Sequence, residues 1–402
     1  MRQILGAFAL LAVGFAAVIT PASAEIKGDA VRIGVLNDQS GPYADLGGPG
    51  SVVAAQMAID DFGGSVLGKP IKLLVADHQN KADVGLSIAR QWYGPDHVDM
   101  IIDFTNSAIA LAVQALAKDQ DKLAIFTSAS SSDLTGPACT PTGIAWTHNN
   151  WSNAVAPIRA LMKQGYDSYF FITADYAFGK SLEADATAEI TRLGGTIKGS
   201  VRHPLNTADF SSFLLQAQGS GAKVVMLANA GADLIGSLKQ AGEFGISPKQ
   251  LVTAPVVYLS DVNSMGLKEA QGLLLMQSWY WDTDDKTRAW AKRYFAKMNR
   301  MPNDSHAGIY SAITHYLKAI QKAGTADTDP VVAAMKATPV EDVFTAHGEI
   351  QSNNKLVFDR LLMRVKKPEE SKYPWDYLEK VATVPAKDAF LAPEKTGCPM
   401  SK

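Results

Sequence analysis

The chain has 402 residues, of which 47% are hydrophobic and 19% charged, and its formal net charge at pH 7 is −2. This composition is typical of a globular protein, and the length exceeds the size at which one hydrophobic core usually keeps growing, so we expect two domains. The near-neutral charge offers no general attraction for nucleic acid or anionic lipid, and we expect no nucleic-acid partner.

Residues 1–24 predict a cleaved signal peptide. Arg2 gives a positive start, an apolar run covers residues 4–19, and residues 21–24 (Pro-Ala-Ser-Ala) supply the small residues of a cleavage site. The alternative is a membrane anchor, but the apolar run is short for a span of roughly 20 residues. We therefore predict an exported, periplasmic protein with no direct membrane insertion.

The next part of the chain alternates short β-branched runs with longer amphipathic stretches. The expected strands cover residues 31–36, 71–76, 98–102 and 123–126, and the expected helices cover residues 47–62, 82–93 and 108–117. Strands and helices at this spacing form right-handed crossovers, which produce a parallel sheet with helices on both faces. This part of the chain predicts a first α/β lobe.

Two cysteines are present in the sequence. Cys139 lies in a loop rich in Pro and Gly, and Cys398 lies four residues before the end of the chain. In an exported protein they allow one pairing, and that bridge would hold the tail against the body of the protein. Two free thiols are the alternative. We predict a structural disulfide, because neither cysteine has a His or a second Cys at metal-ligand spacing.

The alternation of strands and helices restarts after Trp151. The expected strands cover residues 169–173, 196–201, 224–228 and 251–253, and the expected helices cover residues 181–193, 210–218 and 234–244. Two more helices are expected over residues 286–298 and 309–322, and an antiparallel pair of strands over 348–365 and 375–384. We place lobe 1 in residues 25–148 and 281–345, lobe 2 in 149–280 and 346–385, and a C-terminal tail in 386–402. Several crossings between lobes form a hinge.

Small hydroxyl and amide residues follow the carboxyl ends of the predicted strands. These segments are residues 37–43, 105–107, 128–131 and 175–179. In open parallel sheets, ligands bind beyond these ends, and helix N-termini there attract anions. Plain helix capping without a ligand is the alternative. The convergence of several such ends favours a site in which a carboxylate rests against Asn106, Ser107 and residues 128–130.

Residues 40–47 (Ser-Gly-Pro-Tyr-Ala-Asp-Leu-Gly) resemble the opening of type I periplasmic binding proteins of the branched-chain amino acid class. Residues 175–180 are similar to the segment that opens the second lobe of these proteins, and residues 206–211, 239–242 and 269–272 also fit. The resemblance covers nearly all of the mature chain in order. It implies an α/β fold of two doubly wound lobes, a three-crossover hinge and a ligand between the lobes.

Candidate ligand contacts are carried over by position, since the resemblance places them on both lobes. In the first lobe they are Tyr43, Asn106, Ser107, Ser128, Ala129 and Ser130. In the second lobe the resemblance gives Phe178, Ala230 and either Val256 or Val257. Further candidates chosen for their chemistry and place in the chain are Trp151, Asp175, Tyr176 and Tyr258. The expected apolar or aromatic wall consists of Trp151, Tyr176, Phe178 and Tyr258.

The predicted ligand follows from one departure from the family pattern. Amino-acid binders of this class hold the ligand's ammonium with an acidic residue after the last strand, but residues 254–259 contain none. Burying an unpaired ammonium costs several kcal/mol. The sequence therefore favours a small carboxylate, aromatic in particular, and Asp175 keeps the amino-acid alternative open because it could meet an amine.

Other motifs do not indicate catalysis or a cofactor. Residues 63–69 match the spacing of a phosphate-binding loop, but Pro70 takes the place of the metal-binding hydroxyl, so we expect a turn. The sequence has no dinucleotide fingerprint, no hydrolase elbow and no His at metal-ligand spacing. We expect no cofactor, no metal site and no enzyme activity, and a structural or surface role for His203 and His306.

The sequence thus predicts a monomeric substrate-binding component of an ABC importer. Its expected partners are a small-molecule ligand and an inner-membrane permease with ATPase subunits. The ligand would shift an open–closed equilibrium of the two lobes. An extracytoplasmic sensor and a secreted enzyme on an α/β scaffold are the alternatives.

Overall fold

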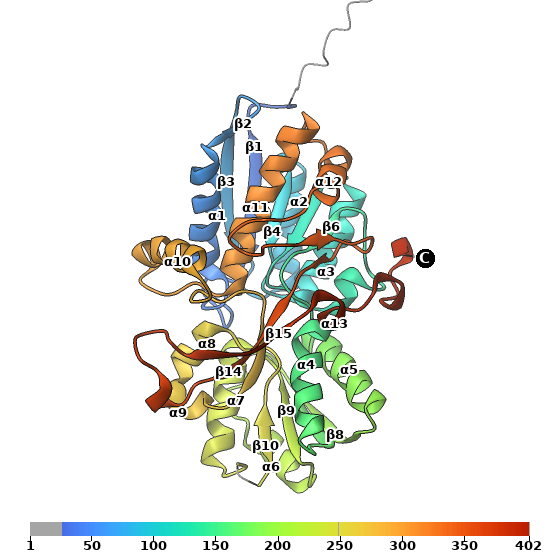
Figure 1. Ribbon diagram of the computed structural model, residues 1–402. Helices are drawn as coiled ribbons and strands as arrows, with labels where there is room; N and C mark the ends of the chain where they lie inside the picture. The colour runs from blue at the N-terminus through green and yellow to red at the C-terminus, as the bar shows by residue number, and fades with distance from the viewer. Residues whose placement is uncertain (1–25, 248, 402) are drawn as a thin grey trace, which may run out of the picture.

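The computed structural model describes residues 26–247 and 249–401 (Figure 1). It contains two α/β lobes, drawn one above the other in this view, with the last strands of the chain lying between them. Within the described ranges, no helix is long and apolar enough to span a membrane. The predicted signal peptide, residues 1–24, lies outside these ranges.

The first lobe is built on a six-stranded sheet with the order β2-β3-β1-β4-β5-β6, which is parallel except for the β2–β3 hairpin. Its strands are β1 (Val31–Asn37), β2 (Ser65–Val66), β3 (Lys69–Asp77), β4 (Met100–Asp103), β5 (Leu123–Phe126) and β6 (Gly143–Ala145). Its helices are α1 (Gly48–Phe62), α2 (Ala82–Tyr93), α3 (Ser107–Asp119), α10 (Asp285–Met298), α11 (Asp304–Ala323) and α12 (Thr328–Lys336), with the 3-10 turn η1 (Ser132–Thr135).

The second lobe is built on a four-stranded parallel sheet with the order β10-β9-β7-β8. Its strands are β7 (Ser168–Ala174), β8 (Thr196–His203), β9 (Val224–Ala228) and β10 (Leu251–Thr253). Its helices are α4 (Asn150–Lys163), α5 (Ala177–Arg192), α6 (Ser211–Gly219), α7 (Gly231–Glu243), α8 (Leu259–Met265) and α9 (Leu267–Ala270). A three-stranded antiparallel sheet adds β11 (Leu274–Gln277), β14 (Arg360–Val365) and β15 (Leu378–Val384).

The two parallel sheets have equivalent strand orders, which confirms the predicted pair of doubly wound α/β lobes. β1 lies between β3 and β4, and β7 lies between β8 and β9. The strand order therefore reverses beside β1 in one lobe and beside β7 in the other. The crevice outside the carboxyl ends of the strands at such a reversal is where open α/β sheets bind ligands.

The segment that matches the spacing of a phosphate-binding loop forms a hairpin turn, as predicted. Ser65 and Val66 pair with Pro70 and Lys69, and Leu67 and Gly68 have left-handed φ angles of 50° and 76°. Two consecutive left-handed residues are typical of the tight turns that join antiparallel strands. This segment therefore forms a hairpin turn at the edge of the first sheet.

The predicted strand over residues 348–365 is wrong, because the chain there forms three short strands. β12 (Glu349–Ile350) and β13 (Leu356–Val357) form a small hairpin, and only β14 pairs with β15. Asn354 has a left-handed φ of 60°, and its side chain donates to the carbonyls of Thr140 and Pro141 at 2.9 and 3.0 Å. The hairpin is thereby attached to the first sheet, whereas β14 and β15 join β11; the lobe boundaries stay a prediction.

Two fully buried basic side chains hold the crossovers between the lobes. Lys355 Nζ donates to the carbonyls of Ala145, Trp146 and Thr147 at 3.3 to 3.4 Å and to that of Leu356 at 2.9 Å. Arg360 Nη1 donates to Ser152 Oγ at 2.7 Å and Asn153 Oδ1 at 2.9 Å at the start of α4. Burial lowers the pKa of Lys355 well below its usual value, and buried polar groups need hydrogen-bond partners such as these. The segments around residues 145–153 and 355–360, the first and third crossovers between the lobes, are therefore tied together at two points.

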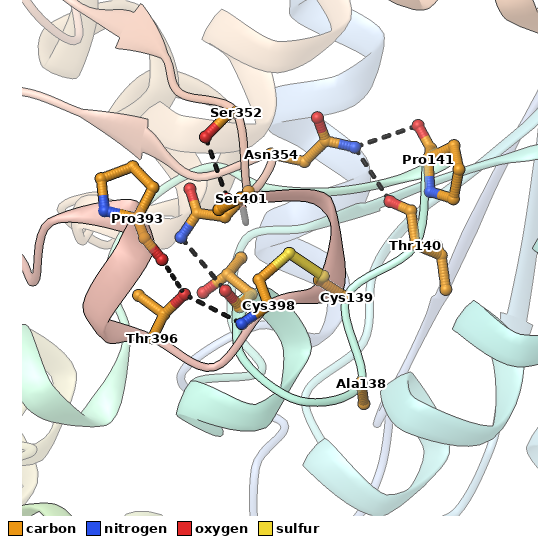
Figure 2. Close-up of a disulfide and its surroundings, with 12 residues drawn as sticks. Ala138, Cys139, Thr140, Pro141, Ser352, Asn354, Pro393, Thr396, Cys398 and Ser401 are labelled. Carbon is orange, nitrogen blue, oxygen red and sulfur yellow. Dashed lines mark hydrogen bonds between the residues drawn. A yellow bond between two sulfur atoms is a disulfide. The ribbon is translucent and has the colours of Figure 1, made fainter.

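The C-terminal tail returns to the first lobe after β15, passing through α13 (Ala386–Ala389). Cys398 is bonded to Cys139, which confirms the predicted disulfide (Figure 2). Hydrogen bonds accompany this bond: Ser352 Oγ lies 2.9 Å from Ser401 Oγ, and Asn353 donates to the carbonyl of Thr135 at 3.1 Å. The remaining short helices are η2 (Pro368–Glu370), η3 (Pro393–Lys395) and η4 (Pro399–Ser401).

Candidate functional site

A small cavity lies between the two lobes, where the segments that follow six strands of the two parallel sheets meet. Its volume is about 20 Å³, which holds roughly one water molecule. An organic solute therefore needs the lobes to separate or the lining side chains to turn. The lining residues are Tyr43, Leu46, Thr105, Ser107, Ser128, Ser130, Tyr176, Phe178, Ala230, Val256 and Tyr258.

Eight of the twelve residues predicted for the site line this cavity. They are Tyr43, Ser107, Ser128, Ser130, Tyr176, Phe178, Ala230 and Tyr258. Leu46 and Thr105 also line the cavity but were not among the predicted contacts, whereas Val256 was named as one of two alternatives. Thr105 was signalled by its place at the carboxyl end of β4, next to the predicted Asn106. Ligand contact by these residues stays a prediction.

The other four predicted residues do not line the cavity. Asn106 caps α3, since its Oδ1 accepts hydrogen bonds from two backbone N–H groups of the first turn at 2.9 and 3.3 Å. Ala129 is buried in the apolar core of the first lobe. The backbone N–H of Trp151 donates to Ser132 Oγ at 3.2 Å. Asp175 is half exposed, and its carboxylate lies 3.0 Å from Lys180 Nζ.

The lobes contact each other directly at the edge of the cavity. Tyr43, from the loop after β1, lies with its hydroxyl 2.8 Å from that of Tyr176, at the start of α5. The N–H of Ala232 in α7 donates to the carbonyl of Pro42 at 3.2 Å. The loop is shaped by Asp38, whose carboxylate accepts from the backbone N–H groups of Gly41 and Tyr43. The contacts between Tyr43 and Tyr176 and between Pro42 and Ala232 exist only while the two lobes lie together.

Two serine hydroxyls of the cavity donate their protons away from it. Ser128 Oγ donates to the buried carboxylate of Asp103, which also accepts from Asn37 Nδ2 at 2.8 Å. Ser130 Oγ donates to Asn150 Oδ1 at 2.9 Å. A hydroxyl has one proton, so each serine has only acceptor lone pairs left for a ligand.

The Thr105 hydroxyl, in contrast, accepts hydrogen bonds from neighbouring protein groups. Its Oγ1 accepts from the N–H of Asp38 at 2.9 Å and lies 3.2 Å from His78 Nε2. Burial lowers the pKa of His78 to about 4, and its Nδ1 accepts from the N–H of Asn80 at 3.1 Å. The single ring proton therefore sits on Nε2 and is donated to Thr105. The hydroxyl proton of Thr105 is left for the cavity.

Further donors come from Ser107 and from two helix N-termini. Ser107 Oγ accepts from the N–H of Ser131 at 3.2 Å, which leaves its proton for the cavity. In the described part of the chain, no side chain caps α5 or α7, whose first residues adjoin Tyr176 and Ala230 of the lining. Free N–H groups at helix starts favour negative charge. This side of the cavity is suited to an anionic group.

Aromatic and aliphatic side chains provide most of the remaining wall. Tyr43, Tyr176, Phe178 and Tyr258 contribute rings, and the Tyr176 and Phe178 rings lie 5.8 Å apart. Burial raises the pKa of Tyr43 and of Tyr258 well above the usual value, so both stay neutral. Within the described ranges, no lining side chain carries a carboxylate or an ammonium group.

A second interlobe contact involves Asp185 of α5, which titrates near neutral pH. Ser132 Oγ donates to its carboxylate at 2.6 Å, and Ser132 N–H donates to Ser181 Oγ at 3.0 Å. Burial is the main cause that raises the pKa of Asp185 to about 7, with a smaller contribution from the charge of Asp133.

We expect Asp185→Asn to change how stability depends on pH. The folded protein retains this proton up to about pH 7, whereas an unfolded Asp loses it near pH 4, so the wild type loses stability as pH rises through this window. The variant lacks this loss, so its melting temperature should exceed that of the wild type at pH 8 and match it at pH 4. Equal differences at both pH values would contradict the raised pKa.

The family model described as "Periplasmic binding protein" matches residues 30–371 of this chain. A crystal structure of a periplasmic binding protein from Burkholderia mallei is 45% identical and covers 93% of this chain and 100% of that chain, with a TM-score of 0.92. A branched chain amino acid ABC transporter periplasmic ligand-binding protein from Burkholderia xenovorans LB400 is 44% identical, covers 92% of this chain and 100% of that chain, and has a TM-score of 0.82.

More distant relatives share the fold or part of the sequence. The Leu/Ile/Val-binding protein homolog 6 of Brucella melitensis is 24% identical over 264 residues, which cover 64% of this chain and 66% of that protein. A solute-binding protein of an ABC transporter from Rhodopseudomonas palustris, solved in complex with benzoate, is 17% identical and covers 92% of this chain and 99% of that chain, with a TM-score of 0.81.

Proposed function

Since the chain belongs to the periplasmic binding protein family, we propose that it captures a small aromatic carboxylate between its lobes and delivers it to an inner-membrane ABC permease. Members of this family are solute-binding proteins that work with ABC transporters in the periplasm. The observation that carries the proposal is a cavity lined by rings and neutral hydroxyls. Such a lining suits a ligand with an apolar ring and one anionic end.

The carboxylate end has suitable donors within the cavity. Thr105 and Ser107 line the cavity and each have a hydroxyl proton that the hydrogen bonds described above do not use, and the starts of α5 and α7, which no side chain caps, add partial positive charge. Hydrogen bonds from neutral donors to a carboxylate are about twice as strong as those between neutral groups. The ring would then lie against Tyr43, Tyr176, Phe178 or Tyr258.

Binding of a branched-chain amino acid is the second candidate. The names of the relatives from Burkholderia xenovorans and Brucella melitensis favour it. The acceptor oxygens of Ser128 and Ser130 would then face the ligand's ammonium. The lining described above has no carboxylate to balance that charge, and a buried ammonium without a counter-charge costs several kcal/mol. We therefore rank this candidate second.

A panel of ligands tested by thermal shift would decide between the two candidates. We expect benzoate and its ring-hydroxylated forms to raise the melting temperature, and leucine and valine to leave it unchanged. A ligand present at a thousand times its Kd adds about 4 kcal/mol of stability. Stabilisation by leucine alone would replace the first candidate with the second.

The same assay tests the cavity residues. We take the acid that gives the largest shift. We expect Ser107→Ala to need at least about ten times more of this acid for the same rise in melting temperature, because the variant lacks a donor to the carboxylate. Ser212→Ala, an exposed serine in α6, is the matched control and should leave the shift unchanged. Recovery of the acid unaltered after long incubation would support a binding role without catalysis.

A further inference from the structure

We infer that His148 and Asp304 are positioning residues that fix Tyr258 as a hydrogen-bond acceptor toward the cavity, so that the site selects an aromatic acid whose ring carries a hydroxyl donor. This inference rests on the proposed function and names the substrate class more closely. Its residues come from three parts of the chain. His148 lies in the first crossover, Asp304 begins α11 of the first lobe, and Tyr258 precedes α8 of the second lobe.

The three side chains form a buried chain of contacts. Tyr258 Oη lies 3.2 Å from His148 Nε2, and His148 Nδ1 lies 3.6 Å from Asp304 Oδ2. All three are at least 95% buried. Asp304 Oδ2 also accepts from the N–H of Ser278 at 3.1 Å, which fixes the carboxylate beside the imidazole.

The charges in this chain determine where the imidazole proton lies. Burial lowers the pKa of His148, so the ring is neutral near pH 7 and carries one proton. Burial alone would raise the pKa of Asp304, but His148 and Arg360 outweigh it and lower that pKa, so the group is a carboxylate. The carboxylate faces Nδ1, and the proton is therefore held on Nδ1, which leaves Nε2 as an acceptor.

This tautomer determines the direction of the hydrogen bond between Tyr258 and His148. Nε2 of His148 can only accept, so the Tyr258 hydroxyl donates its proton to it. The nearby Ser305 hydroxyl donates instead to the carbonyl of Thr127 at 3.1 Å. Tyr258 is thus left with lone pairs for the cavity, as Ser128 and Ser130 are. A ligand must bring an O–H donor to this group or leave its oxygen unpaired.

A polar atom that is left without a hydrogen-bond partner in a desolvated site costs free energy. A ligand that pairs this atom therefore binds more tightly than one that does not. A phenolic hydroxyl satisfies the Tyr258 oxygen, whereas a methoxy group brings a second acceptor to the same place. We expect hydroxybenzoates to bind at least about tenfold more tightly than the matching methoxybenzoates. Both the 3- and 4-substituted pairs are needed, because the ring can place its hydroxyl at either position.

The first arm of the test needs no ligand. Long-range proton–nitrogen NMR of the ¹⁵N-histidine-labelled full chain, with the His148 signals assigned by their loss in His148→Asn, should show Nδ1 protonated and Nε2 bare. Asp304→Asn removes the charge that selects this tautomer and should shift the signals toward an Nε2-protonated ring. A wild-type ring protonated on Nε2, or on both nitrogens, at pH 7 would overturn the inference.

The second arm measures the ratio of hydroxybenzoate to methoxybenzoate affinity by calorimetry. Tyr258→Phe should reduce this ratio to about one, and Asp304→Asn should reduce it several-fold, whereas Tyr169→Phe, a buried tyrosine of β7 outside the cavity, should not. An unchanged ratio in Tyr258→Phe overturns the inference while the proposed function stands. If no aromatic acid binds, the proposed function fails. The NMR measurement of the His148 tautomer then tests by itself whether His148 and Asp304 fix the Tyr258 hydroxyl.

Discussion

Replacing Cys139 and Cys398 with alanine is expected to lower the free energy of unfolding by about 3 to 5 kcal/mol. The bond joins residues separated by 259 positions, so it removes much of the conformational freedom of the unfolded chain. It also holds the short η3 and η4 turns of the tail against the first lobe (Figure 2). Urea unfolding of the oxidised wild type and the double variant measures this difference.

The control for this experiment leaves the bond in place. Ser352→Ala removes only the hydrogen bond between the 352 and 401 side chains, which is exposed, and should cost less than about 1 kcal/mol. Hydrogen exchange should show faster exchange of residues 393–401 in the cysteine double variant than in Ser352→Ala. An unfolding midpoint that reduction of the wild type leaves unchanged would contradict a stabilising role for the bond.

Gly231→Ala is expected to weaken ligand binding roughly 10- to 100-fold, because it prevents the lobes from meeting. Gly231 begins α7 with a left-handed φ of 58°, and a Cβ there would lie 2.5 Å from the carbonyl oxygen of Pro42 and 2.8 Å from the Tyr43 ring. Pro42 and Tyr43 belong to the first lobe, so the clash exists only when the lobes are together. Calorimetry with the acid that gives the largest thermal shift measures the loss.

The matched control lies on the same helix. A Cβ on Gly236 would meet nothing closer than the Phe210 ring at 3.6 Å, which is ordinary contact, so Gly236→Ala should bind the acid like the wild type. Without ligand, Gly231→Ala should lose only the roughly 1 to 2 kcal/mol that a left-handed alanine costs. Binding of Gly231→Ala at wild-type affinity would show that the lobes do not need this contact.

The fold was predictable where apolar periodicity is local. β1 has a continuous buried run, and the strands and helices expected in both lobes are present with small shifts at their ends. Helix α4 was missed, because it begins with polar residues and contains Pro157, which local rules place at a helix end. The break at Asn354 was missed because the turn is held by carbonyls more than 200 residues away in sequence.

The site was predictable as a set of strand ends, but not side chain by side chain. Ser128 and Ser130 line the cavity while Ala129 between them packs into the core, as successive residues of an extended chain point to opposite sides. Asn106 turns back to cap α3, which leaves Ser107 to face the cavity. The directions of the hydroxyl protons depend on partners such as Asp103, Asn150 and His78, which only the folded chain brings close.

The two buried basic side chains between the lobes also mark the segments that would have to change if the lobes moved relative to each other. Lys355 donates hydrogen bonds to the carbonyls of residues 145–147, so it is attached to the first lobe, the upper half of the molecule in Figure 1. Arg360 donates hydrogen bonds to side chains in the first turn of α4, so it is attached to the second lobe, the lower half. A change in the angle between the lobes would then require backbone rotation in residues 148–149 and 358–359, which lie between these two anchored parts, and in residues 278–284, where the chain crosses between β11 and α10.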